Sequence, residues 1–164
     1  MLPITPVDLR AAFVNASRKE VASITLPDWF DDADWASLNY LGWRDPKIAR
    51  RAYVVAPTLD GEPVGIVLRR ADAAPRARAQ CSWCQDVRLP NDVVLYSAKL
   101  AGAAGRRGDT VATLLCEDFE CSRNVRKLPP LAYEGYDLEA ARLRRIDELR
   151  MRAAGFADAV VRER

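Results

Sequence analysis

The sequence predicts an α+β fold in which β-hairpins lie between helical segments at the two ends of the chain. β-branched runs at 52–56 and 63–68 flank Asp60-Gly61, which is a strong hairpin signal. Apolar residues recur at helical spacing over 137–161. Four cysteines in two short pairs mark a compact module between the hairpin and this helix. With 164 residues, 49% of them hydrophobic and 29% charged, the chain supports one soluble domain with a small appendage.

The N-terminal segment predicts a short helical lead. Thr5 is the expected N-cap, Pro6 suits the first helical position, and Asp8 places negative charge in the first turn. The expected apolar face comprises Leu9, Ala12, Phe13 and Ala16. We expect this helix to fade over 17–21.

A second short helix is predicted to follow Asp31. Asp31, Asp32 and Asp34 fit the start of a helix better than an acidic site, since negative charge there favours the helix dipole. The helix would bury Trp35 and Leu38 and stop at 41–42, with Gly42 as the left-handed cap. Trp43 is expected to fill the core rather than bind a partner, because aromatic burial is large.

The middle of the chain is expected to connect the first hairpin to a second one. Residues 71–80, rich in alanine and arginine with one proline, predict a mobile connector. Runs at 93–97 and 110–115 predict two strands joined by a loop over 102–108. The Arg107-Gly108-Asp109 tripeptide in this region is interpreted as a sequence that favours a turn.

Cys81 and Cys84 are separated by two residues, and Cys116 and Cys121 by four. Two short-spaced pairs let each chain segment supply two thiolates to a tetrahedral zinc ion. Four thiolates fill the coordination sphere, so the metal would be structural. An iron–sulfur cluster remains an alternative. A disulfide scaffold and a thioredoxin-like redox site are disfavoured, because no secretion signal is present and a redox pair would leave the second pair unexplained.

The elements around the cysteines predict a treble-clef zinc finger. Residues 81–84 would form a knuckle, Cys116 would end the second strand, and Cys121 would lie in the first turn of a helix running to Arg126. This module would be fused to a small hairpin/helix subdomain. The C-terminal amphipathic helix, interrupted or bent near Gly155, is expected to pack on the domain, with partner binding as the alternative.

Charge and composition exclude several functions. The chain has no histidine, so no Ser-His-Asp or Cys-His pair can be built, and we expect no enzyme. The formal charge of +2 falls to about zero with four thiolates and one Zn²⁺, which gives no global support for nucleic-acid binding. We find no secretion signal and no membrane span, and we expect a cytoplasmic protein.

The sequence resembles the FusB/FBP-type elongation factor G-binding proteins, and specifically their C-terminal treble-clef zinc-finger domain. The resemblance runs from about Phe13 to Arg126 and is carried by the cysteine module and by four segments: 41–45 (Leu-Gly-Trp-Arg-Asp), 65–68, 95–98 and 108–110. It predicts an FBP-type domain over 1–130, divided into 1–70 and 80–128, and a helical extension over 131–164. Those relatives carry an N-terminal helical bundle, whereas this chain has a short helical lead.

The resemblance implies one structural zinc on Cys81, Cys84, Cys116 and Cys121, and binding to translation elongation factor G on the ribosome. Relatives help that GTPase leave ribosomes trapped by fusidic acid, without acting as enzymes. No small-molecule substrate is implied. A ribosome- or RNA-binding protein is the alternative.

The candidate partner-binding residues are aromatic and basic side chains on the second hairpin and after the last cysteine. They either form a docking surface or balance the negative charge of the metal site. These residues are Tyr96, Lys99, Arg106, Arg107, Arg123, Arg126 and Lys127.

Overall fold

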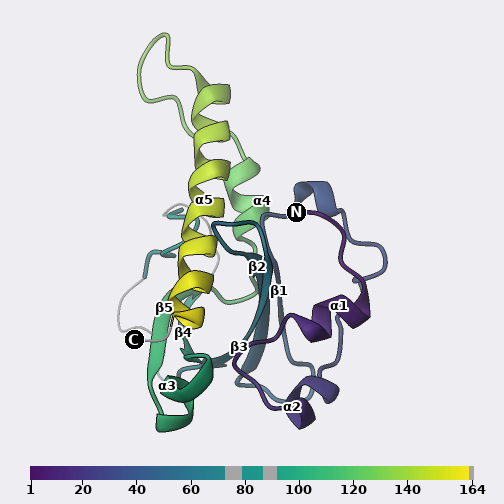
Figure 1. The fold of residues 1–164 in the computed structure, drawn as a ribbon. Helices are drawn as coiled ribbons and strands as arrows, with labels where there is room; N and C mark the ends of the chain where they lie inside the picture. The colour runs from purple at the N-terminus through teal and green to yellow at the C-terminus, as the bar shows by residue number, and fades with distance from the viewer. Residues whose placement is uncertain (73–78, 87–91, 163–164) are drawn as a thin grey trace.

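In residues 1–72, 79–86 and 92–162, which the computed structural model describes, five strands form one antiparallel sheet (Figure 1). Each strand pairs with the next along the chain, so the spatial order is the sequence order. The strands are β1 (Leu41–Arg44), β2 (Arg51–Pro57), β3 (Pro63–Arg70), β4 (Val93–Lys99) and β5 (Thr110–Cys116). The predicted connector at 71–80 lies largely outside the described residues.

The β2–β3 hairpin confirms the prediction from the Asp60-Gly61 pair. Gly61 has a φ of +90°, a conformation that glycine adopts at little cost. The two strands pair from Pro57 opposite Pro63 to Arg51 opposite Arg69. The first hairpin pairs with the second over a short stretch, since only two residues of β3 are paired with β4.

The N-terminal lead forms two short helices rather than one fading helix. In α1 (Pro6–Ala11) the Thr5 side chain accepts a hydrogen bond from the Asp8 N–H, which confirms the predicted cap. The prediction that this helix continues and fades over 17–21 is wrong, because the backbone of residues 12–14 leaves the helix to pair with Gly65. A separate helix, α2 (Arg18–Ala22), then begins with a capping box between Ser17 and Glu20.

The predicted second helix is wrong. Only a 3₁₀ turn, η1 (Trp35–Ser37), forms after the acidic run, and Trp35 and Leu38 are half-buried beneath it. Gly42 is not a helix cap but a residue of β1, where it pairs with Val54. Pairing with β2 supplies hydrogen bonds that a helix end would have left open. Trp43 is buried, as predicted, and its indole N–H donates to the Thr25 carbonyl at 2.9 Å.

Three helices follow β4 in the described part of the chain. Residues predicted as the 102–108 loop form the short helix α3 (Gly102–Arg107), which ends at Gly108 with a φ of +101°. The helix α4 (Cys121–Arg126) starts at Cys121, as predicted. The helix α5 (Leu138–Val161) is continuous through Gly155, so the predicted interruption is wrong. One exposed glycine costs only about 1 kcal/mol, and the buried residues on either side hold the helix on the core.

The core has two parts, one on each face of the sheet. Between α5 and the sheet lie Val54, Ile66, Leu149 and Phe156, continuous with the four cysteines and Trp83. On the opposite face, where α1 contacts β3, Leu9 of α1 and Phe13 just after this helix form a cluster with Trp43 of β1 and Tyr53 of β2. α5 therefore packs on the domain, and α4 lies along its first half (Figure 1). None of the helices that the structure describes is both long and apolar enough to cross a membrane.

Candidate metal centre

The first cysteine pair lies in a tight turn attached to the edge of the sheet. Gln85 donates its N–H to the Cys81 carbonyl at 3.0 Å, and Gln85 itself has a φ of +53°. The Ser82 N–H bonds the Leu114 carbonyl of β5 at 2.8 Å. These bonds fix the turn, so both sulfurs are presented from one rigid knuckle.

The second pair brackets the turn between β5 and α4. Cys116 is the last residue of β5 and Cys121 is the first of α4. Phe119, between them, has a φ of +60°, and its N–H bonds the Cys116 carbonyl at 3.1 Å. Knuckle, β4–β5 hairpin and α4 together make the predicted treble-clef arrangement.

The four sulfur atoms converge in a buried cluster. The Sγ atoms of Cys81 and Cys121 are 3.5 Å apart, and those of Cys84 and Cys116 are 3.7 Å apart. All four ligand atoms lie within 4.8 Å of one another. Thiolates at the usual Zn–S distance around a tetrahedral ion are separated by about 3.8 Å. The four cysteines are therefore positioned to bind one metal ion, as in a treble-clef zinc finger.

The four thiols shift one another's pKa values in opposite directions, because their sulfur atoms are buried close together. Hydrogen bonding from the neighbouring thiols, Cys116 first among them, lowers the pKa of Cys81 well below its usual value. The same neighbours raise the pKa of Cys121. Buried sulfurs so close together share protons, and a bound cation would let all four ionise. Four thiolates would leave no open coordination position for water or substrate, which is the pattern of a structural site.

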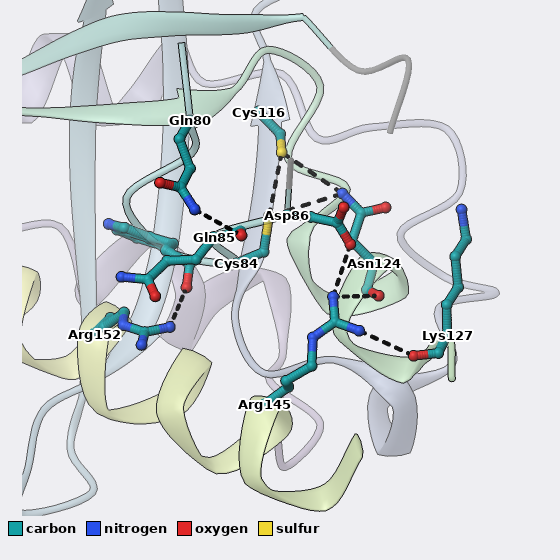
Figure 2. Close-up of polar contacts among 10 residues, drawn as sticks. Gln80, Cys84, Gln85, Asp86, Cys116, Asn124, Lys127, Arg145 and Arg152 are labelled. Carbon is teal, nitrogen blue, oxygen red and sulfur yellow. Dashed lines mark hydrogen bonds and ion pairs between the residues drawn. The ribbon is translucent and has the colours of Figure 1, made fainter. Parts of the chain in front are cut away.

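Asn124 is a functional residue that the sequence analysis missed. Its side-chain N–H₂ group donates to Cys116 Sγ at 3.6 Å and points toward Cys84 Sγ at 3.9 Å (Figure 2). The residue is fully buried in α4. Donation to sulfur would stabilise the thiolate and help to orient it for metal binding. Its position three residues after Cys121, on the same side of a helix, was the available signal.

α5 fastens both halves of the metal centre. Arg145 donates to the Asp86 carboxylate at 2.7 Å and to the Lys127 carbonyl at 3.1 Å, so it joins the knuckle segment to the end of α4 (Figure 2). About two turns further along α5, Arg152 donates to the Trp83 carbonyl at 3.0 Å. The C-terminal helix therefore supports the metal centre as well as the sheet.

The predicted partner-binding residues do not form one surface. Lys99, Arg106 and Arg107 lie near the end of the β4–β5 hairpin that carries α3. Arg123, Arg126 and Lys127 lie on and after α4, beyond the other end of the hairpin, about 20 Å away along seven-residue strands.

Two of these residues are committed to the fold. Tyr96 is only 1% exposed, and its hydroxyl donates to the Glu117 carbonyl, because its position on β4 faces the core. The prediction that it lies on a docking surface is therefore wrong. Arg126 is half-buried and donates to Asn39 Oδ1 at 2.6 Å and to the Ser122 carbonyl at 2.8 Å. The remaining five side chains are exposed.

Comparison with known proteins agrees with this site. The model of the FBP C-terminal treble-clef zinc-finger family matches residues 8–160. Among solved structures, the chain is similar to the fusidic acid resistance protein FusC, with a TM-score of 0.56 at 21% identity, over 76% of this chain and 53% of that chain. The chain thus spans about half the length of FusC, and the likeness concerns the fold. No curated protein matches the sequence. Since the family match takes in nearly the whole chain and all four cysteines, the protein belongs to the FBP C-terminal treble-clef zinc-finger family.

Proposed function

We propose that this protein is a zinc-stabilised, non-enzymatic binding protein whose partner is translation elongation factor G, and that it modulates the action of this factor on the ribosome in the cytoplasm. Membership of the FBP zinc-finger family supports the proposal. The fold is also shared with FusC, a fusidic acid resistance protein. A closed four-thiolate site fits a scaffold for binding better than a catalytic centre.

The observation that carries the proposal is a run of exposed apolar and basic side chains on α4 and in the segment that follows it. Beyond α4 the chain exposes Leu128 (60%), Leu131 (65%) and Tyr133 (64%). Arg123 and Lys127 stand beside this segment and make no ion pair with any described residue. Aromatic, leucine and arginine side chains presented by a rigid support are typical of protein–protein hot spots. We call these five residues the α4 surface.

The part of the α4 surface that carries Arg123 and Lys127 is held in place by the metal centre and by α5. α4 begins at a cysteine of the metal site, and Arg145 on α5 bonds the carbonyl of Lys127 at its end. A binding surface that is already ordered loses less conformational entropy when its partner docks. Metal binding and partner binding are therefore expected to be coupled through α4.

Titration of purified elongation factor G with the zinc-loaded protein tests the proposal. Tyr133→Ala and Arg123→Ala should each weaken the complex by roughly fivefold or more, because truncating a hot-spot residue costs over about 1 kcal/mol. Arg107→Ala is the matched control, since this arginine is exposed at the opposite end of the hairpin. Zinc content must stay constant in all three. Absence of wild-type binding at micromolar concentration would overturn the proposal.

A further inference from the structure

A basic groove lies near the end of the β4–β5 hairpin that carries α3, away from Cys116. It has a volume of about 550 Å³ and opens between the α1–α2 segment and neighbouring end positions of β2, β3 and β4. Among the described residues that line it, four are cationic and one is acidic: Arg50, Arg51, Arg69, Lys99 and Glu20. The cations come from three neighbouring strands and their connections, so the sheet pairing brings them together.

The walls of the groove are fixed by hydrogen bonds. The Asn15 side-chain amide donates to the carbonyls of Val67 and Lys99, each at 3.0 Å, and its oxygen accepts from the Val67 N–H at 2.8 Å. Glu20 accepts from the Ser17 N–H at 2.8 Å as part of the α2 capping box. The Glu20 carboxylate is therefore held by the α2 backbone, which lowers its pKa, and the nearby charges of Lys99 and Arg51 also help to lower it.

The cations of the groove divide into two pairs. Arg51 bonds the buried Asp45 carboxylate at 2.6 Å, and Arg50 bonds Asp72 at 2.6 Å. Arg69 and Lys99 form no ion pair within the part of the chain that the structure describes. Arg51 and Arg50 thus shape the wall, whereas Arg69 and Lys99 are available to an anion.

Further positive charge surrounds the same end of the sheet. Arg18 and Lys19 are exposed on α2, which the Asn15 bonds attach to the end of β4. Arg106 and Arg107 are exposed on α3, which begins three positions after the end of β4. The whole chain has a formal charge of only +2, so this basic end is a local excess that the total charge conceals.

The composition of the groove favours RNA over protein as its ligand. Interfaces between proteins are depleted in charge at their centres, whereas nucleic-acid interfaces are rich in positive charge. The hydroxyls of Ser97 and Thr110 also line the groove, and beside free cations they can bond the 2′-hydroxyl of RNA. None of the described residues that line it is aromatic, so contacts would be made to the sugar–phosphate backbone and not by base stacking.

We propose that this groove binds the phosphate backbone of RNA, with Arg69 and Lys99 as its phosphate-contacting residues and little dependence on base sequence. The α4 surface and the groove lie at opposite ends of the β4–β5 hairpin. The protein can therefore contact RNA and a protein partner at once. The inference does not depend on the identity of that partner.

Fluorescence anisotropy with the zinc-loaded full chain tests the inference, using a labelled single-stranded RNA of roughly 16 nucleotides. The double variant Arg69→Gln/Lys99→Gln should bind at least about tenfold more weakly, since two charge-assisted contacts are lost. The slope of log affinity against log salt should fall by about 0.7 for each lost phosphate contact. Both side chains are exposed, and an unchanged circular dichroism spectrum and zinc content would verify the fold.

The matched control is Arg144→Gln/Arg150→Gln, which removes the same charge from exposed positions on α5. This control should retain wild-type RNA affinity, and both double variants should retain affinity for elongation factor G. Equal losses in the two double variants would overturn the inference in favour of a net-charge effect. So would DNA of the same sequence binding as tightly as RNA, or the absence of RNA binding by the wild type at about 50 mM salt. Loss of elongation factor G binding alone in the groove variant would identify the groove as a protein interface instead.

Discussion

The Phe119 ring lies directly against Gly42, and a Cβ atom added to this glycine would come within 2.7 Å of two ring carbons. Phe119 occupies the turn between Cys116 and Cys121, and its ring stacks on Tyr96 with centroids 5.3 Å apart. Two residues after Gly42, Arg44 bonds the Glu117 carboxylate at 3.0 Å. β1 and the metal-binding turn therefore pack as one unit, although 74 residues separate Arg44 from Asp118 in the sequence.

Gly42→Ala should lower the free energy of unfolding by about 1–3 kcal/mol, because an inserted methyl group forces the neighbouring ring or backbone to move. Phe119 cannot move freely, since Tyr96 lies against its ring and the cysteines hold its backbone on both sides. Urea unfolding of the zinc-loaded protein measures the change. Chelator-induced zinc release should also become faster in the variant.

Gly155→Ala is the matched control and should act in the opposite direction. It adds the same methyl group in the second half of α5, where nothing beyond the adjoining helix backbone lies within 4 Å. Alanine is better than glycine in a helix interior, so stability should rise by about 0.5–1 kcal/mol. A loss of stability in Gly155→Ala, or none in Gly42→Ala, would contradict this account of the two glycines.

The sequence predicted what depends on local signals. The Thr5 cap, the Asp60-Gly61 turn and the short cysteine spacings each specify their structure within a few residues. Gly42 was misinterpreted because its role is decided by Phe119, which is remote in sequence. The residues next to Gly42 in the sequence do not indicate which distant side chain packs against it.

The basic groove could not be predicted for a related reason. Arg51 and Arg69 come together because they are paired across β2 and β3, and Arg69 is paired with Ser97 of β4. No periodicity in the sequence connects these positions. The metal ligands, in contrast, were evident as the only cysteines in the chain.

Asp45 should make stability depend on pH. Burial acts to raise its pKa, but hydrogen bonds from Tyr53, from the Lys47 and Ile48 N–H groups and from Arg51 hold it below the usual value. A lowered folded-state pKa contributes stability above the unfolded pKa of about 3.9, and this is lost as the pH falls through the folded value.

Asp45→Asn should therefore cost roughly 1.5–3 kcal/mol at neutral pH and progressively less below about pH 4. Acid also protonates the metal-binding thiolates in both proteins, so the readout is the difference between wild type and variant at each pH. Asp60→Asn, at an exposed turn position, should change stability by less than about 0.5 kcal/mol. A difference that stays constant down to about pH 2 would show that Asp45 makes no such contribution.

The metal should be required for the fold of the module. We expect one zinc ion per chain, and Cys116→Ser should lose most of the stabilisation, since structural zinc contributes on the order of 10 kcal/mol. Metal analysis and thermal unfolding, with and without a chelator, measure both effects. Ser82→Ala is a control within the knuckle, because it leaves all four sulfurs and the Ser82 backbone bond in place. Iron in the purified protein, or a folded chain with four free thiols and no metal, would contradict the prediction.

Asn124 should control how firmly the zinc is held. Its N–H₂ group faces Cys116 and Cys84, so Asn124→Asp replaces a donor by an acceptor and adds negative charge beside two thiolates. Loss of a supporting contact to a metal ligand typically lowers affinity by 10- to 100-fold, roughly. A competition titration with a chromophoric chelator measures this directly.

Asn39→Asp separates the effect on the metal from general destabilisation. Asn39 is also buried, but its side chain bonds Arg126 and the Ile146 carbonyl instead of a sulfur. Both variants should unfold at lower denaturant concentration, because each leaves a buried group without its partner. Only Asn124→Asp should weaken zinc binding strongly at a pH where the protein remains folded. If the two variants lost zinc to the same extent, the Asn124 contacts to sulfur would have no specific role at the metal.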